Sequence, residues 1–446
     1  MSIAHGHKGG FVRSSSLRPR SLAVGVVLLV AVTTVACSST NTASTTTTTG
    51  GSGGSSAVPA SAMTDHTGIT ADSVKVANVS TLTAGLFKGA GVGTQAYADY
   101  VNSTGGVNGR KIQVTVADDT FSGAGNKQAT QSAINNDFAM VGNFSLEDSF
   151  GGTLLAQNPG VPDVAVTLDP ATSKLPNVYN AQPAAGGWEE GPLQYLKKKF
   201  PQDINGVGTL LGNLPSAQPG WNGEKYVMEK LGYKIVYSPT YAVTQSDFTA
   251  NVVAMKNAGV KMLFIDQMPQ NYASSVLKDL VQQNFHPIVV LGAAAYSNAL
   301  VASSGGAGAV NGAYLDQNQS LYLGQDAADV PAVATFLHWV DVASPGFKAD
   351  LFTLYGWLSA ELFAQGLKNA GTTPSRGSLL QALNKITSFD GDHIVTPANP
   401  VAKVVGNCYL LGHVVNGQFQ RLDDPPISGS THGFRCDYAY VKPPGV

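Results

Sequence analysis

The sequence predicts an α/β protein with two similar lobes, each built on a mostly parallel β-sheet flanked by helices. Short apolar runs typical of strands alternate with helical patterns of about 10–15 residues, as they do in βαβ units. This alternation runs once from Val74 to Val166 and then restarts at Val207. Two consecutive series favour two lobes over one large sheet.

The first series contains four expected strands and two expected helices. The strands are at 74–79, 112–117, 138–141 and 161–166, and the helices are at 93–102 and 126–135. In the first helix, Ala96, Tyr97, Tyr100 and Val101 recur at helical spacing, and the pair Gly105-Gly106 ends it.

The second series repeats this pattern and closes with a hairpin. Its strands are expected at 207–211, 233–237, 262–266 and 288–291, and its helices at 223–231, 248–258 and 272–283. A long apolar helix follows at 351–370. The last two apolar runs, 408–415 and 418–422, flank Asn416-Gly417, a dipeptide that strongly favours a hairpin turn.

The N-terminus has the pattern of an export signal. Basic residues precede an apolar run from Leu22 to Val32, and small residues lead into Cys37. A cysteine directly after Val35-Ala36 resembles the bacterial lipobox, although Thr34 departs from it. We therefore expect 1–36 to be a lipoprotein signal peptide and Cys37 to be lipidated. The alternatives are an ordinary signal peptide or a membrane anchor, but a spanning helix needs roughly 20 apolar residues.

Composition indicates a tether after the signal and limits the possible binding partners. Residues 37–66 are rich in Ser, Thr and Gly and read as a tether. The formal charge of −2, with 13% charged residues, gives no support for binding nucleic acid. With Cys37 used by the lipid, Cys408 and Cys436 remain as a pair, and we expect a disulfide because an exported protein meets an oxidising environment. Two buried free thiols are the alternative.

Several motifs recur in a characteristic order along the chain. They are Val101–Ile112 followed by Val116–Asp119, Val141–Ser145, Gly160–Pro162, Asp247–Phe248 with Met255–Gly259, and Tyr355–Gly371 with Leu379–Ile386. Together they resemble the type I periplasmic binding proteins, in the branch that binds leucine, isoleucine and valine for ABC importers. The resemblance covers about Ile69 to Leu422. It implies two α/β lobes joined by a hinge of three crossovers, with lobe one at 67–181 and 320–390 and lobe two at 182–319 and 391–446.

The resemblance also implies a small-molecule site between the lobes. Asn143, Ser145 and Thr167 occupy positions at which the family holds a ligand's carboxylate. Loops of lobe two offer Gln218, Trp221 and Gln267, and we expect Phe87 and Trp221 to cover the ligand's body. The family's acceptor for an ammonium group is missing, because Gly292–Tyr296 carries no carboxylate. Asp266, at a strand end, is the one residue that could substitute for it, and a buried structural role is the alternative for this residue. A ligand with an anionic or amide head is therefore favoured.

Other motifs have simpler interpretations. Gly91-x-Gly93-x-x-Ala96 with Asp118 matches a dinucleotide fingerprint, but some ten residues separate it from the preceding strand, so we interpret these glycines as turn-formers of the ligand loop. Glu189-Glu190 reads as a solvated helix face or a helix N-terminus. The histidines are scattered without metal-ligand spacing. We expect no cofactor and no metal.

The sequence therefore predicts a lipid-anchored solute-binding protein without enzymatic activity, on the outer face of the cytoplasmic membrane. Its expected partners are a small ligand (an amino acid, an amide or a small carboxylate), the permease and ATPase subunits of an ABC importer, and the membrane through the lipid. A ligand sensor of the same fold is the alternative. An exported hydrolase is a third, but no Gly-x-Ser-x-Gly motif supports it.

Overall fold

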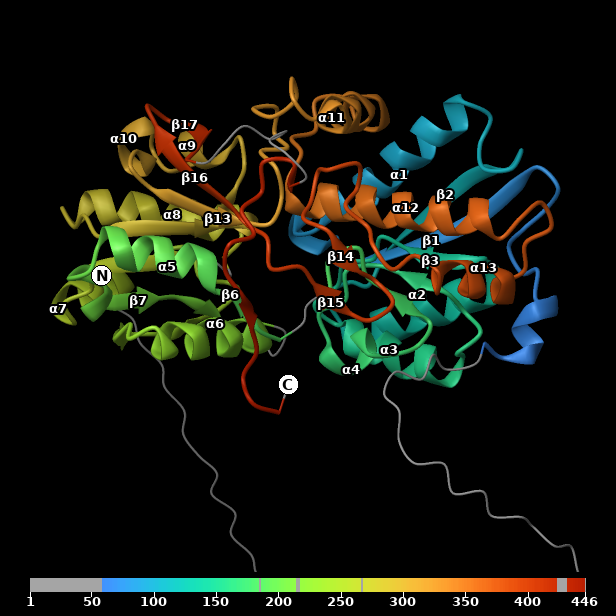
Figure 1. Cartoon of the computed structure of the whole chain (residues 1–446), viewed down its shortest axis with the longest axis horizontal. Coiled ribbons are helices and arrows are strands. Elements are labelled where there is room, and N and C mark those ends of the chain that lie inside the picture. Colours follow the sequence, from blue (N-terminus) through green and yellow to red (C-terminus); the bar gives the residue numbers. More distant parts are fainter. Residues whose placement is uncertain (1–57, 184–185, 214–216, 266–267, 423–430, 446) are drawn as a thin grey trace, which may run out of the picture. The chain divides into compact units, whose positions relative to one another are not determined.

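The computed structural model describes residues 58–183, 186–213, 217–265, 268–422 and 431–445. Cys37, Asp266 and Gln267 lie outside these ranges. The described residues belong to one compact unit that contains two separate β-sheets (Figure 1). We call the parts built on these sheets lobe one and lobe two.

Lobe one contains a five-stranded parallel sheet in the order β2-β1-β3-β4-β5. Its strands are β1 (Ser73–Ser80), β2 (Lys111–Asp118), β3 (Ala139–Val141), β4 (Asp163–Val164) and β5 (Val178–Tyr179). Its helices are η1 (Ala60–Thr64), η2 (Thr83–Gly85), α1 (Lys88–Ser103), α2 (Gly123–Asn136), α3 (Asp148–Gln157), α4 (Pro170–Ser173), α11 (Pro331–Ala343), α12 (Leu351–Asn369) and α13 (Arg376–Leu383). Apolar residues on both faces of β1 are buried, so helices cover both faces of the sheet (Figure 1).

Lobe two contains a seven-stranded sheet in the order β17-β16-β13-β12-β11-β7-β9. Its strands are β7 (Val207–Thr209), β9 (Ile235–Tyr237), β11 (Met262–Ile265), β12 (Ile288–Gly292), β13 (Tyr314–Gln317), β16 (Leu410–Val415) and β17 (Gln418–Arg421). Its helices are α5 (Glu190–Lys199), η3 (Asp203–Asn205), α6 (Gln218–Lys230), α7 (Thr249–Asn257), α8 (Gln270–Gln282), η5 (Ala293–Ala295), α9 (Leu300–Ser303) and α10 (Ala307–Val310). Its five parallel strands repeat the topology of lobe one, with β7 in the place of β1. The α/β fold with helix-flanked parallel sheets is confirmed.

Two-stranded ribbons complete the structure. They are β8 (Leu211–Gly212) with β10 (Thr240–Tyr241), β14 (Ala398–Asn399) with β15 (Val404–Val405), and β6 (Trp188–Glu189) with β18 (Tyr440–Val441). The hairpin β16–β17 turns at Asn416 and Gly417, whose φ angles are 52° and 75°. Both positive values suit the tight turn that Asn-Gly favours, so the predicted hairpin is confirmed.

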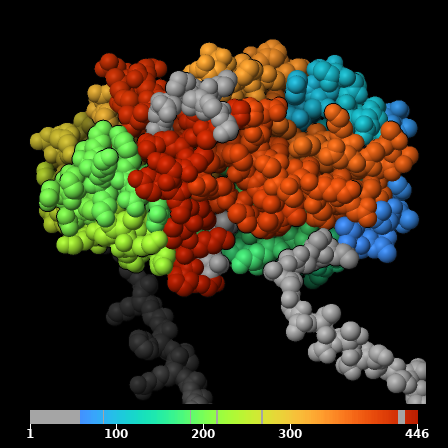
Figure 2. Space-filling model, viewed as in Figure 1, coloured from blue at the N-terminus to red at the C-terminus, as the bar shows by residue number. Residues whose placement is uncertain are grey.

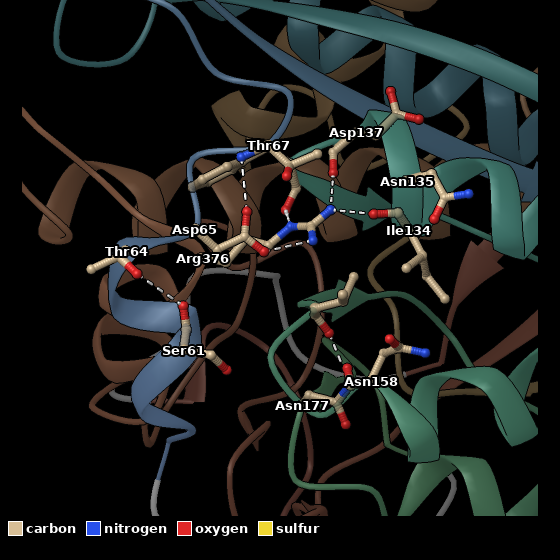
Figure 3. A network of polar contacts seen from close by, with 12 residues as sticks. Ser61, Thr64, Asp65, Thr67, Ile134, Asn135, Asp137, Asn158, Asn177 and Arg376 are labelled. Atoms are coloured by element: carbon tan, nitrogen blue, oxygen red, sulfur yellow. Dashed lines mark hydrogen bonds and ion pairs between the residues drawn. The ribbon is translucent and has the colours of Figure 1, made fainter.

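Arg376 joins the N-terminal segment to the body of lobe one (Figure 3). Its side chain is only 4% exposed and donates hydrogen bonds to the carbonyl oxygens of Ile134, Asp137 and Phe138. It also forms an ion pair with Asp65 at 2.9 Å. We expected the tether to reach residue 66, but η1 packs against α13 with Ala62 buried, so the end of that segment belongs to the folded body.

Candidate ligand-binding cleft

The topology fixes where a ligand can bind. In both lobes the strand order reverses at the first strand, β1 or β7, and ligands of open α/β sheets bind beyond the carboxyl ends of strands at such a point. A cavity of about 1120 Å³ lies there, lined by residues of both lobes. Phe87, Phe144 and Thr167 line it from lobe one, and Gly212 and Ala293 line it from lobe two.

An aromatic floor, which we define as Phe87, Phe144 and Phe352, forms the lobe-one face of the cleft. The three rings come from the loops after β1 and β3 and from the first turn of α12. Their centroids lie 4.6–4.8 Å apart, and each ring is less than 10% exposed. Leu86, Leu146 and Leu168 pack against them and also line the cleft. Lobe one therefore presents an apolar surface to a ligand.

The polar groups at the strand ends of lobe one bond to one another behind this floor. Ser145 donates a hydrogen bond to Asp119, and it accepts one from Asn126 at 3.0 Å. Asn143 donates to Asp163 at 2.8 Å and accepts from the Val79 N–H at 2.8 Å. Ser145 and Asn143 line a second cavity of about 30 Å³ instead of the main cleft.

Of the remaining site residues expected from the sequence, some line the cleft and others do not. Phe87 and Thr167 line the cleft. Trp221 is 7% exposed and packs in the core of lobe two, while Gln218 begins α6, and neither lines the cleft. Gln267 lies outside the described residues. The structure thus brings Phe87 and Thr167 together in the cleft and leaves Asn143, Ser145, Gln218 and Trp221 outside its lining.

The glycines of the dinucleotide-like motif have a structural role. Gly91 and Gly93 lie inside α1, not in the loop before it. A Cβ atom at Gly93 would overlap the carbonyl oxygen of Thr353 in α12, and one at Gly91 would press on Val116 of β2. The interpretation of these residues as turn-formers of the ligand loop is therefore wrong. They allow α1 to pack closely against α12 and β2.

Glu189 is a cleft residue that the sequence did not reveal. It lies at the end of β6, just before α5, and lines the cleft, whereas Glu190 points away and bonds Lys230 at 2.9 Å. Burial raises the pKa of Glu189 to about 7. Both glutamates lie at the N-terminus of α5, which was one of the two interpretations drawn from the sequence, but that interpretation did not distinguish the two carboxylates. The pairing of β6 with β18, more than 200 residues later in the chain, places Glu189.

Lys403 is a second charged group of the cleft. Its ammonium group lies 4.9 Å from the centroid of the Tyr179 ring. Burial lowers its pKa to about 8, and the charge of Asp163 partly opposes this shift. Burial also raises the pKa of Asp163 to about 7, with repulsion from Asp148 adding to the rise and Lys403 opposing it. Lys403 and Asp163 therefore partly balance each other's charge.

The expected disulfide between Cys408 and Cys436 is present. Beside it, the backbones of Tyr409 and Arg435 exchange two hydrogen bonds of 2.8 Å, and the Tyr409 hydroxyl donates to Asp437 at 2.7 Å. These contacts fix the C-terminal segment, whose strand β18 pairs with β6 next to the cleft. Figure 2 shows this red segment at the surface, between the green residues of lobe two and the orange residues of lobe one.

The described residues contain neither a metal-binding cluster nor a membrane-spanning helix. No cluster of three or more His, Cys, Asp or Glu side chains there is arranged to hold a metal ion. Within the same ranges, no helix combines the length and the apolar character needed to cross a bilayer.

Comparison with known proteins identifies the family. Residues 73–417 match the model of the periplasmic binding proteins. The Leu/Ile/Val-binding protein homolog 1 of Brucella abortus is 23% identical over 286 residues, which cover 63% of this chain and 73% of that protein.

Solved structures of similar fold include two transport proteins. A fatty acid ABC transporter substrate-binding protein from Thermomonospora curvata has a TM-score of 0.68 at 18% identity, covering 83% of this chain and 96% of that one. A branched-chain amino acid ABC transporter from Thermus thermophilus with bound valine has a TM-score of 0.68 at 14% identity, covering 81% of this chain and 98% of that one.

The family match covers most of the chain, and the two-lobed α/β architecture agrees with it. These relatives are solute-binding proteins, not enzymes, and the family indicates an extracytoplasmic location. The chain therefore belongs to the periplasmic binding protein family, with the type I fold of its branched-chain amino acid-binding-like members.

Proposed function

We propose that this protein is a lipid-anchored solute-binding protein that captures a small molecule between its two lobes and delivers it to an ABC importer. The observation that carries the proposal is the cleft of about 1120 Å³ at the carboxyl ends of both parallel sheets. Its volume suits a small organic molecule, and its lining combines many apolar side chains with a few charged ones, as ligand sites do. Closure of the lobes around the ligand would form the state that a permease recognises.

A thermal-shift screen of the purified protein tests ligand capture. The compounds are amino acids, amides, short carboxylates, aromatic acids and apolar amines. A ligand present at 100 times its dissociation constant should stabilise the protein by about 2.7 kcal/mol. A raised melting temperature with one chemical class supports the proposal, and a flat response to all five classes contradicts it.

Replacement of Cys37 by alanine tests the anchor. The residue follows an apolar run and small residues, as the acylated cysteine of a lipoprotein does. We expect Cys37→Ala to move the protein from the membrane fraction to the soluble fraction, while the wild type stays in the membranes. Fractionation with an alkaline wash measures this. A variant that remains in the washed membranes would show that the N-terminal segment itself is the anchor.

A further inference from the structure

Among the described residues, no side chain offsets the charge of Glu189. It lines the cleft and is half-buried. Among the described residues, no Lys, Arg or His lies within ion-pairing distance of its carboxylate, and no other side chain donates a hydrogen bond to it. Removing such a carboxylate further from water, as a bound ligand would, favours proton uptake or a cationic partner.

The other charged residues of the cleft do not supply that partner. Lys225 pairs with Glu229 at 3.8 Å, and the charge of Lys403 is partly balanced by Asp163. Asp316 has an interaction partner of its own. Lys174 and Lys442 are exposed. Within the described part of the cleft, Glu189 is therefore a half-buried carboxylate without a cationic partner.

The rest of the ligand's surroundings are mostly apolar. The aromatic floor and its leucine neighbours belong to lobe one, and Ala293, Ala294 and Pro219 line the cleft from lobe two. The strand-end hydroxyl of Ser145, which could have bound an anionic head, is already bonded to Asp119. A ligand that matches this lining has a large apolar body and one cationic hydrogen-bond donor.

We propose that Glu189 accepts the protonated amine of the ligand, whose apolar body lies against Phe87, Phe144 and Phe352. This inference rests on the proposed function, since it assigns the ligand's chemistry in the same cleft. The ligand would then have a cationic head, whereas the sequence favoured an anionic or amide head. The reason for the change is that β6 supplies the acidic group that the Gly292–Tyr296 loop lacks. The amine would form a charge-assisted hydrogen bond, which is stronger than one between neutral groups.

Matched pairs of amines and carboxylates test this assignment. The probes are tryptamine with indole-3-propionate, and isoamylamine with 4-methylpentanoate, so that each pair keeps the body and changes the head. Titration calorimetry is run at pH 8, above the pKa of about 7 of Glu189. We expect at least one amine to bind tenfold or more tightly than its carboxylate counterpart. Glu189→Gln should remove that preference by weakening the amine at least tenfold.

The control variant is Glu190→Gln, which alters the adjacent carboxylate that bonds Lys230 outside the cleft. It should keep the preference of the wild type. Tighter binding of the carboxylates, or a preference unchanged in Glu189→Gln, would overturn the inference and leave ligand capture intact. The amine-to-carboxylate ratio of the wild type decides the outcome even if Glu189→Gln does not fold. If neither probe pair shows measurable binding, the inference is overturned. If no compound of the wider screen binds either, the proposed function is contradicted as well.

Discussion

Replacing Arg376 by methionine should lower the free energy of unfolding by about 3–5 kcal/mol, because three carbonyl groups lose their buried hydrogen-bond donor at a cost of about 1–3 kcal/mol each. The guanidinium holds three backbone carbonyl oxygens, those of Ile134, Asp137 and Phe138, together with the carboxylate of Asp65. Methionine fills a similar volume but leaves these acceptors without their donors. Urea denaturation followed by circular dichroism measures the change.

Asp65→Asn is the matched control, because it removes the ion pair and keeps the carbonyl contacts. Since Asp65 is partly exposed, its loss should cost about 1 kcal/mol or less. Burial raises the pKa of Asp65, but hydrogen bonds from Thr67 and the charge of Arg376 outweigh it and leave the pKa below its usual value. The pair's contribution is therefore present at neutral pH and is lost as the pH falls through that lowered pKa. Equal losses in Arg376→Met and Asp65→Asn would contradict the role given to the carbonyl contacts.

Removing the disulfide should be the second large effect. Cys408 and Cys436 are 28 positions apart, and closing a loop of that length stabilises a fold by about 3–4 kcal/mol in the chain-entropy model. We expect the double variant Cys408→Ser, Cys436→Ser to lose this amount in urea denaturation. The affected region should be the C-terminal segment with β18, which pairs with β6 beside the cleft.

The reduced wild type provides the comparison. It should unfold at the same urea concentration as the double variant, since both lack the same bond. If the oxidised wild type and the double variant had the same unfolding midpoint in urea, the disulfide would add no stability. Mass mapping under non-reducing conditions should recover the two cysteine peptides as one linked species.

The sequence predicted the regular parts of the fold because local patterns determine them. The alternation from Val74 onward located β1, α1, β2, α2 and β3, and the Asn416-Gly417 pair located the final hairpin. Helix bounds were less accurate, because α1 starts at Lys88, five residues before the expected start. Gly89 and Gly91 weakened the helical pattern there. The close approaches that make these glycines necessary, of α12 to Gly89 and of β2 to Gly91, are long-range contacts.

The candidate site was harder to predict, because it depends on which side chains satisfy one another. Asn143 and Ser145 stand at the expected strand end, yet Asp163 and Asp119 accept their hydrogen bonds. Trp221 was expected to cover a ligand, but the position of its side chain on α6 turns it into the core. The environment of Glu189 depends on a strand from the C-terminal segment. None of these partners is near in sequence, so local patterns carry no signal of them.

Titration calorimetry on a cleft-blocking variant tests the central claim, capture of a small molecule between the lobes, most directly. Ala294 is partly exposed, lines the cleft from lobe two and follows the end of β12. Ala294→Trp should fill part of the cavity while the folded core stays unchanged. With the strongest ligand of the screen, we predict binding to the wild type with a stoichiometry of one and at least a tenfold loss of affinity in Ala294→Trp. Equal affinity in both proteins would show that the ligand binds elsewhere and would contradict the account.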